Sequence, residues 1–203
     1  MSNVIFEASF RCMRRRRPRA PRHTRGYIHN PSKMLTFPYH TLHEFLDEWG
    51  LQRTSTAKIF HALTNDSLGQ EETPGGRTLG GLAWHIVRSV RMQLLNAGVS
   101  PEEVDHDAPQ PGTAAAIAAA YDTDAEMLAV RIATHWTDAT LAERFTQYGR
   151  EWTRAAALRA LIMHQAHHRG QMTILMRQAG LPVPGIVGPS REERAAMIAA
   201  SKS

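Results

Sequence analysis

The sequence contains one cysteine among 203 residues, and it lacks any apolar run long enough to cross a membrane. The single cysteine, Cys12, cannot form a disulfide within the chain, excludes zinc sites built from several thiolates, and fits a reducing compartment. A membrane helix needs about 20 consecutive apolar residues. We therefore expect a cytoplasmic protein without a membrane-spanning segment.

Excess positive charge is missing from most of the chain, although the net charge of the whole is +5. Residues 1–33 carry nine of the 24 Lys and Arg and one of the 19 Asp and Glu, which gives this segment a charge of +8. Residues 34–203 carry the remaining 15 basic and 18 acidic residues, a charge of −3. This distribution argues against a basic domain of the kind that binds nucleic acid.

The segment 1–33 differs from the rest in composition, with the run Arg14–Arg17 and three prolines but no sustained periodicity. Because like charges repel and proline interrupts helices, we expect a disordered tail in front of a domain at 34–203. Three interpretations are open: an electrostatic arm for nucleic acid or anionic surfaces, a targeting peptide, or upstream sequence translated ahead of a true start at Met34. We favour the last.

The domain at 34–203 shows helical periodicity and no strand-like alternation of any length. Thr41 with Glu44, and Ser190 with Glu193, have the form of capping boxes at the start of helices. We predict four long helices and a short last one, at approximately 41–63, 78–97, 113–136, 150–179 and 190–200. The sequence thus indicates an all-α protein, a four-helix bundle with a short extra C-terminal helix.

Two histidines of the fourth predicted helix are spaced so that they can share a metal ion. His164 and His168 are four residues apart and therefore lie on one helix face, about 5–6 Å apart at Cβ. They fall in line with the apolar residues Leu161 and Met172, so we expect them to point into the bundle. His167 is turned by about 100° from His168 and should point elsewhere.

A pair of histidines four apart arises often by chance, and the interpretation gains weight from His85 on the inward side of the second predicted helix. Three imidazoles from two helices match catalytic zinc sites, which keep one position open for water or substrate. Since no cysteine or carboxylate accompanies them, we predict one divalent ion, zinc or nickel rather than magnesium or calcium, on His85, His164 and His168.

Residues next to these histidines admit more than one interpretation. Gln165 and Gln171 could orient the ligand imidazoles or a metal-bound water, or could simply be solvated. Arg169 could hold an anionic substrate, but an ordinary surface or dimer-contact arginine is the interpretation we favour. Gly170, in mid-helix, could permit the close approach of another helix or could be tolerated without a purpose.

Three segments carry a recognisable pattern: TLGGLAWHI (78–86), HQAHHRGQ (164–171) and GLPVPGIVGP (180–189). Together they resemble the signature regions of the DinB/YfiT-like superfamily, and the resemblance spans roughly 34–190. It implies a four-helix bundle with the connectivity of that superfamily, a divalent metal on His85, His164 and His168, and frequent homodimers. Members of known activity include metal-dependent thiol transferases and a thiol-dependent isomerase, which use low-molecular-weight thiols such as bacillithiol or mycothiol.

The functional hypothesis is therefore a metal-dependent transferase that activates a low-molecular-weight thiol toward a small electrophile. The alternative is a non-catalytic stress-response protein in which the ion ties the second and fourth helices together. No side chain is singled out as a general base. We expect a homodimer, no membrane partner, and no nucleic-acid binding apart from sequence-independent binding through the Arg-rich tail.

Overall fold

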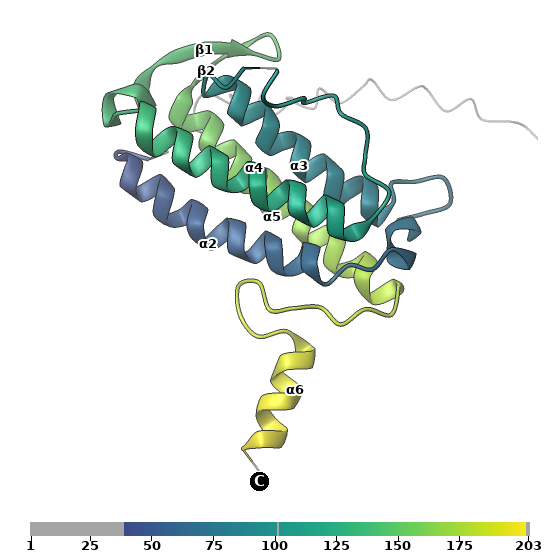
Figure 1. Ribbon diagram of the computed structural model, residues 1–203. Helices are drawn as coiled ribbons and strands as arrows, with labels where there is room; N and C mark the ends of the chain where they lie inside the picture. The colour runs from purple at the N-terminus through teal and green to yellow at the C-terminus, as the bar shows by residue number, and fades with distance from the viewer. Residues whose placement is uncertain (1–38, 101, 202–203) are drawn as a thin grey trace, which may run out of the picture. The chain divides into compact units, whose positions relative to one another are not determined.

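The computed structural model describes residues 39–100 and 102–201 (Figure 1). Within these ranges the chain is mostly helical, and the predicted four-helix bundle with a short C-terminal helix is confirmed. The predictions for residues 1–33 and for a start at Met34 lie outside the described residues. No helix in the described ranges has the length and apolarity that a membrane span requires. The bundle helices are α2 (Leu42–His61), α3 (Leu79–Asn96), α4 (Ala114–His135) and α5 (Arg154–Gln178), and α6 (Arg191–Ala200) follows them.

Side-chain caps explain where the helices begin. The hydroxyls of Thr78, Thr113 and Thr153 each accept a hydrogen bond from a backbone N–H in the first turn of α3, α4 and α5. Both predicted capping boxes are present, at Thr41 for α2 and at Ser190 for α6. Each cap satisfies an N–H that has no partner inside the helix, which stabilises the helix by about 1 kcal/mol.

The four long helices enclose one apolar core. Both α2 and α3 pack against α4 and α5, so α4 and α5 occupy opposite corners of the bundle (Figure 1). The largest fully buried side chains come from α2, α3 and α4, and they include Trp49, Tyr121, Phe45 and Phe60. Trp49 Nε1 donates to the Ala125 carbonyl at 3.0 Å and so ties α2 to α4.

A β-hairpin precedes α5, and it corrects the prediction of a helix that begins at about residue 150. Strand β1 (Arg144–Gln147) pairs antiparallel with β2 (Arg150–Thr153), and α5 begins only at Arg154. The turn residues Tyr148 and Gly149 both have positive φ, 52° and 69°, as a two-residue hairpin turn requires. Four-residue strands are too short to show an alternating pattern, and the cross-strand pair Phe145–Trp152 is formed only by the pairing.

The remaining short elements connect the bundle helices. The 3₁₀ helices η1 (Asp66–Gly69) and η2 (Asp138–Ala142) follow α2 and α4. Gly180, with φ of 74°, adopts the left-handed conformation that ends α5. Glycine is the residue that most often takes this position after a helix. A segment without regular structure then leads to α6, none of whose side chains is buried.

Candidate metal centre

The structure brings the three predicted histidines together between α3 and α5. His85 lies in the second turn of α3, and His164 and His168 lie one turn apart near the middle of α5. The Nε2 atoms of His85 and His164 are 2.9 Å apart, and those of His164 and His168 are 3.1 Å apart. All three donor nitrogens fall within 4.8 Å of one another, and no other group of this kind occurs among the described residues.

His167 is not part of this group, as its rotation on the helix predicts. Its side chain is exposed on α5, whereas His168 is only 6% exposed. The ring of His167 contacts that of His168 at a centroid distance of 4.9 Å. The two neighbours therefore face different directions, and only His168 joins His85 and His164.

Burial keeps the three imidazoles neutral at pH 7. It lowers the pKa of His85 and His168, and it lowers the pKa of His164 to about 4. Neighbouring imidazoles and the guanidinium of Arg77 shift the pKa in the same direction, because a second positive charge nearby disfavours protonation. Neutral imidazole is the form that donates a lone pair to a metal.

Gln171 fixes the orientation of His168. The Nδ1–H of His168 donates to Gln171 Oε1 at 2.6 Å, one turn further along α5. Because that nitrogen carries the proton, the lone pair of His168 lies on Nε2 and points at the other two histidines. A hydrogen bond to the non-ligating nitrogen is the usual way in which proteins orient metal-binding histidines.

The side chain of Gln165 contacts α2 and α4, which differs from the expectation that it orients a ligand imidazole. Its side chain is fully buried and its Oε1 accepts hydrogen bonds from Thr56 and Tyr121, each at 3.0 Å. Its Nε2 has no hydrogen-bond partner in the part of the chain that the structure describes, so it donates to none of the three histidines. Gln165 belongs to the core behind the histidines.

Arg169 is also buried, and the prediction of a surface or dimer-contact arginine is wrong. Only 3% of it is exposed, and its guanidinium donates to Gln52 and Thr56 of α2. The four-residue spacing of Gln165 and Arg169 could have indicated a polar inward face. Polar residues on a helix are more often solvated, however, and the sequence alone favours that interpretation.

An ion pair supports α3 beside His85. Arg91 Nε donates to Asp124 Oδ2 of α4 at 2.6 Å, and both side chains are largely buried. The same guanidinium lies 4.8 Å from the ring centroid of Trp84, whose Nε1 donates to the Ala108 carbonyl. These contacts hold the α3 turn that carries His85 against α4 and the loop before it.

The donor set fits a divalent ion. Zinc binds imidazole nitrogen at 2.0–2.1 Å, which at tetrahedral angles places two nitrogens about 3.3 Å apart, close to the Nε2 spacings of 2.9 and 3.1 Å. Neutral imidazoles whose lone pairs converge repel one another unless a proton or a metal ion lies between them. No fourth His, Cys, Asp or Glu joins the group among the described residues, and His85 and His164 are only half-buried.

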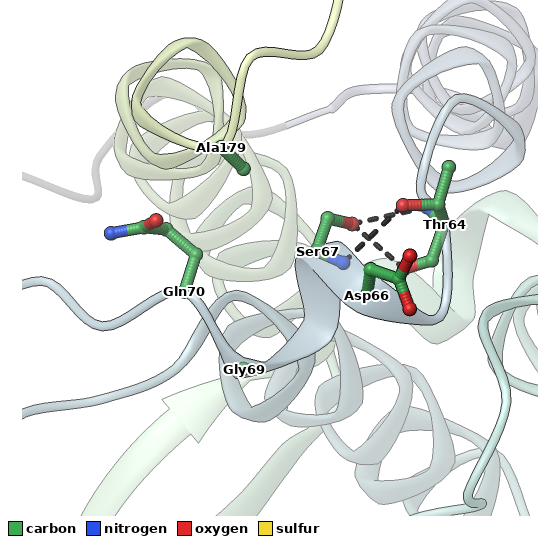
Figure 2. A pocket seen from close by; sticks show the side chains of 6 residues that line it. All are labelled: Thr64, Asp66, Ser67, Gly69, Gln70 and Ala179. Carbon is green, nitrogen blue, oxygen red and sulfur yellow. Dashed lines mark hydrogen bonds between the residues drawn. The ribbon is translucent and has the colours of Figure 1, made fainter.

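A separate hollow of about 620 Å³ lies at the end of α5 (Figure 2). Its lining is largely polar and comes from the segment after α2 and from the residue that ends α5. The lining residues are Thr64, Asp66, Ser67, Gly69, Gln70 and Ala179. None of them is a candidate ligand, and the hollow is distinct from the three histidines.

Comparison with known proteins identifies relatives over most of the chain. The model of the DinB family matches residues 34–201. The uncharacterized protein YrdA of Bacillus subtilis (strain 168) is 42% identical over 155 residues, which cover 76% of this chain and 93% of YrdA. A crystal structure of a DinB-like protein from Bacillus cereus ATCC 10987 is 42% identical with a TM-score of 0.68, and the match covers 73% of this chain and 99% of that one.

A more distant structure shows the fold alone. The DinB-like protein YjoA of Bacillus subtilis is 19% identical to this chain with a TM-score of 0.54. The match covers 68% of this chain and 95% of YjoA. The bundle architecture is thus shared beyond the range of clear sequence similarity.

Proposed function

This chain belongs to the DinB family, and from that premise we propose that it is a metal-dependent transferase that activates a low-molecular-weight thiol toward a small electrophile. The observation that carries the proposal is the convergence of His85, His164 and His168 without a fourth protein ligand among the described residues. Three imidazoles and an open side are typical of catalytic rather than structural sites.

The proposed cofactor is one zinc or nickel ion. The donors are neutral nitrogens, which suit these metals better than magnesium or calcium. A bound ion of this kind lowers the pKa of a thiol at its open position, so that thiolate is available at neutral pH. His168 presents Nε2 because Gln171 accepts from its Nδ1–H.

The half-exposed side of the site supports a catalytic role over a purely structural one. His85 and His164 retain solvent exposure, whereas His168 and Gln165 behind them do not. We propose that a small thiol reaches the donor nitrogens of His85 and His164 from this side. We propose bacillithiol- or mycothiol-like thiols as substrates, in agreement with the resemblance of the signature segments.

The test has two steps. The protein purified without chelator is first analysed for zinc and nickel, and the loaded protein is then assayed for loss of free thiol with a chloronitrobenzene as electrophile. His85→Ala is the matched control. Thiol loss that requires both metal and His85 supports the transferase. Bound metal without any thiol loss across a panel of electrophiles would instead favour the non-catalytic, structural role.

A homodimer is part of the proposal. It is supported by two large apolar side chains on the outer face of α5, Met163 and Ile174, which are 56% and 59% exposed. Gly170 lies between them, and a Cβ there would meet nothing within 4 Å. Sedimentation of the purified protein should give the mass of two chains, and a mass near 22.7 kDa at all concentrations would contradict this.

A further inference from the structure

The middle of α5 is held in the bundle by polar side chains. Before it, the buried residues of α5 are apolar up to Ile162, and after it they are apolar from Met172 onward. Between these two positions the buried residues are Gln165, His168 and Arg169. Apolar contacts are non-directional. The packing on either side therefore specifies the rotation of this segment and its position along the helix axis only loosely.

Arg169 makes directional contacts with two consecutive turns of α2. Its Nη1 donates to Thr56 Oγ1 at 2.9 Å and to the Gln52 carbonyl at 3.4 Å. Its Nη2 donates to Gln52 Oε1. Three acceptors on one face of α2 therefore surround one planar guanidinium, an arrangement that suits its fixed fork of donors.

Gln165 extends these contacts to α4. Its Oε1 accepts from Thr56 Oγ1 and from the Tyr121 hydroxyl, each at 3.0 Å. We refer to Gln52, Thr56, Tyr121, Gln165 and Arg169 as the core polar cluster. The cluster connects α5 with both α2 and α4, and all its members except Gln52 are at most 3% exposed.

The charge of Arg169 has no carboxylate partner among the described residues. A buried charge of this kind costs free energy that an apolar residue of similar volume would avoid. We therefore expect Arg169 to contribute to the specific arrangement of the helices rather than to the free energy of unfolding. Fixing the register of one helix against another is the best-attested use of such buried polar groups.

The core polar cluster and the candidate metal centre alternate along α5. Gln165 follows His164 and Arg169 follows His168, and successive helix residues are rotated by 100°. The glutamine and arginine face α2 and α4, whereas the two histidines face His85 of α3. A slide of α5 by one turn, 5.4 Å, would break the cluster and separate nitrogens that now lie 2.9 Å apart.

We propose that Arg169 is a positioning residue of the candidate metal centre. Through Gln52 and Thr56 it fixes the rotation of α5 and its position along the helix axis, so that His164 and His168 converge with His85. The inference rests on the proposed function for its significance, but the convergence of the rings is a property of the metal-free chain and can be measured in it.

The experiment compares two variants of the cluster with one control on the same helix. Arg169→Met removes the hydrogen bonds at similar volume, and Thr56→Val removes the shared hydroxyl in case the first variant fails to fold. Leu158→Ala creates a cavity in α5 away from the histidines, where the leucine is 1% exposed. Each full-length protein is measured for zinc affinity by chelator competition and for NOEs between histidine rings in the metal-free state.

We expect both cluster variants to bind zinc at least tenfold more weakly, as is usual when a group that orients the ligands is lost. They should also lose the ring NOE between His85 and His168, whose centroids are 4.7 Å apart. Leu158→Ala should melt at a lower temperature and yet keep the wild-type affinity and NOE.

Wild-type affinity and NOE in Arg169→Met and Thr56→Val would overturn the proposal. So would losses that follow the melting temperature equally in all three variants, because Arg169 would then be merely structural. If the wild-type protein binds no zinc, the proposed function fails and the NOE comparison still decides the role of Arg169.

Discussion

His164 and His168 lie one turn apart on α5, yet their second ring nitrogens have different surroundings. Nδ1 of His168 donates to Gln171, which fixes its tautomer, whereas Nδ1 of His164 is buried and has no hydrogen-bond partner within residues 39–100 and 102–201. His164 also has the more strongly lowered pKa, about 4, because burial opposes its protonation. At the scale of single residues, the imidazoles of the site therefore favour the neutral form, which donates a lone pair to a metal, over the protonated form.

Individual histidines should differ sharply in their effect on metal content. His164→Ala and His168→Ala should each lose most of the bound metal, because two imidazoles hold an ion far more weakly than three. His167→Ala should keep about one metal per chain, since its exposed ring lies outside the group of donors. Elemental analysis of the three purified variants checks this, and metal loss in His167→Ala alone would contradict the observed register of α5.

At the scale of elements, one largely buried ion pair lies between α3 and α4. Asp124 Oδ2 and Arg91 Nε are 2.6 Å apart, and the two side chains are 8% and 14% exposed. Burial raises the pKa of Asp124 even beside this guanidinium, which shows how strongly the carboxylate is desolvated. Loss of the aspartate would leave Arg91 without its charged partner beneath the turn that carries His85.

Asp124→Ala should therefore lower the free energy of unfolding by about 3 kcal/mol, because it leaves a largely buried charge unpaired. Asp107→Ala is the matched control. Asp107 also pairs with an arginine, Arg88 at 2.8 Å, but its side chain is 86% exposed. An exposed pair of this kind contributes less than about 1 kcal/mol. Urea denaturation of both variants distinguishes the two sites, and equal effects would be inconsistent with a special role for burial.

At the scale of the whole molecule, an ion on the three histidines would join α3 to α5, which are far apart in the sequence. A ligand that binds only the native state adds RT ln(1 + [L]/Kd) to its stability, about 2.7 kcal/mol at a hundredfold excess over Kd. Chelation should therefore lower the melting temperature of the wild-type protein. It should leave that of His168→Ala unchanged, and calorimetry with and without chelator measures both. Indifference of the wild type to chelator would exclude a tightly held ion.

Acid should destabilise the metal-free protein in a defined range. The unfolded chain binds protons on its histidines near pH 6.5, whereas native His164 does so only near pH 4. Between these values the unfolded state binds more protons, so the free energy of unfolding falls as the pH is lowered from about 6.5 to about 4. Denaturation of the chelated protein across this range measures the slope. His164→Ala should have a shallower slope, and an unchanged one would refute the assignment.

Much of the fold could be predicted from the sequence because it depends on local signals. The hydroxyls of Thr41, Thr78 and Ser190 cap helices through contacts within a few residues, and the apolar periodicity of the bundle helices is equally local. Helix geometry alone placed His164 and His168 on one face. The hairpin was missed because its strands are too short to carry a pattern and its pairing forms between strands.

The sequence alone thus indicates the four bundle helices, the short helix α6 and the two-histidine face of α5. That His85 meets this face depends on the packing of α3 against α5, which no spacing in the sequence specifies. The structure also decided that Gln165 and Arg169 are buried. In the middle of α5 polar residues occupy several directions around the helix, and only the acceptors on α2, with the hydroxyl of α4, determine which of them turn inward.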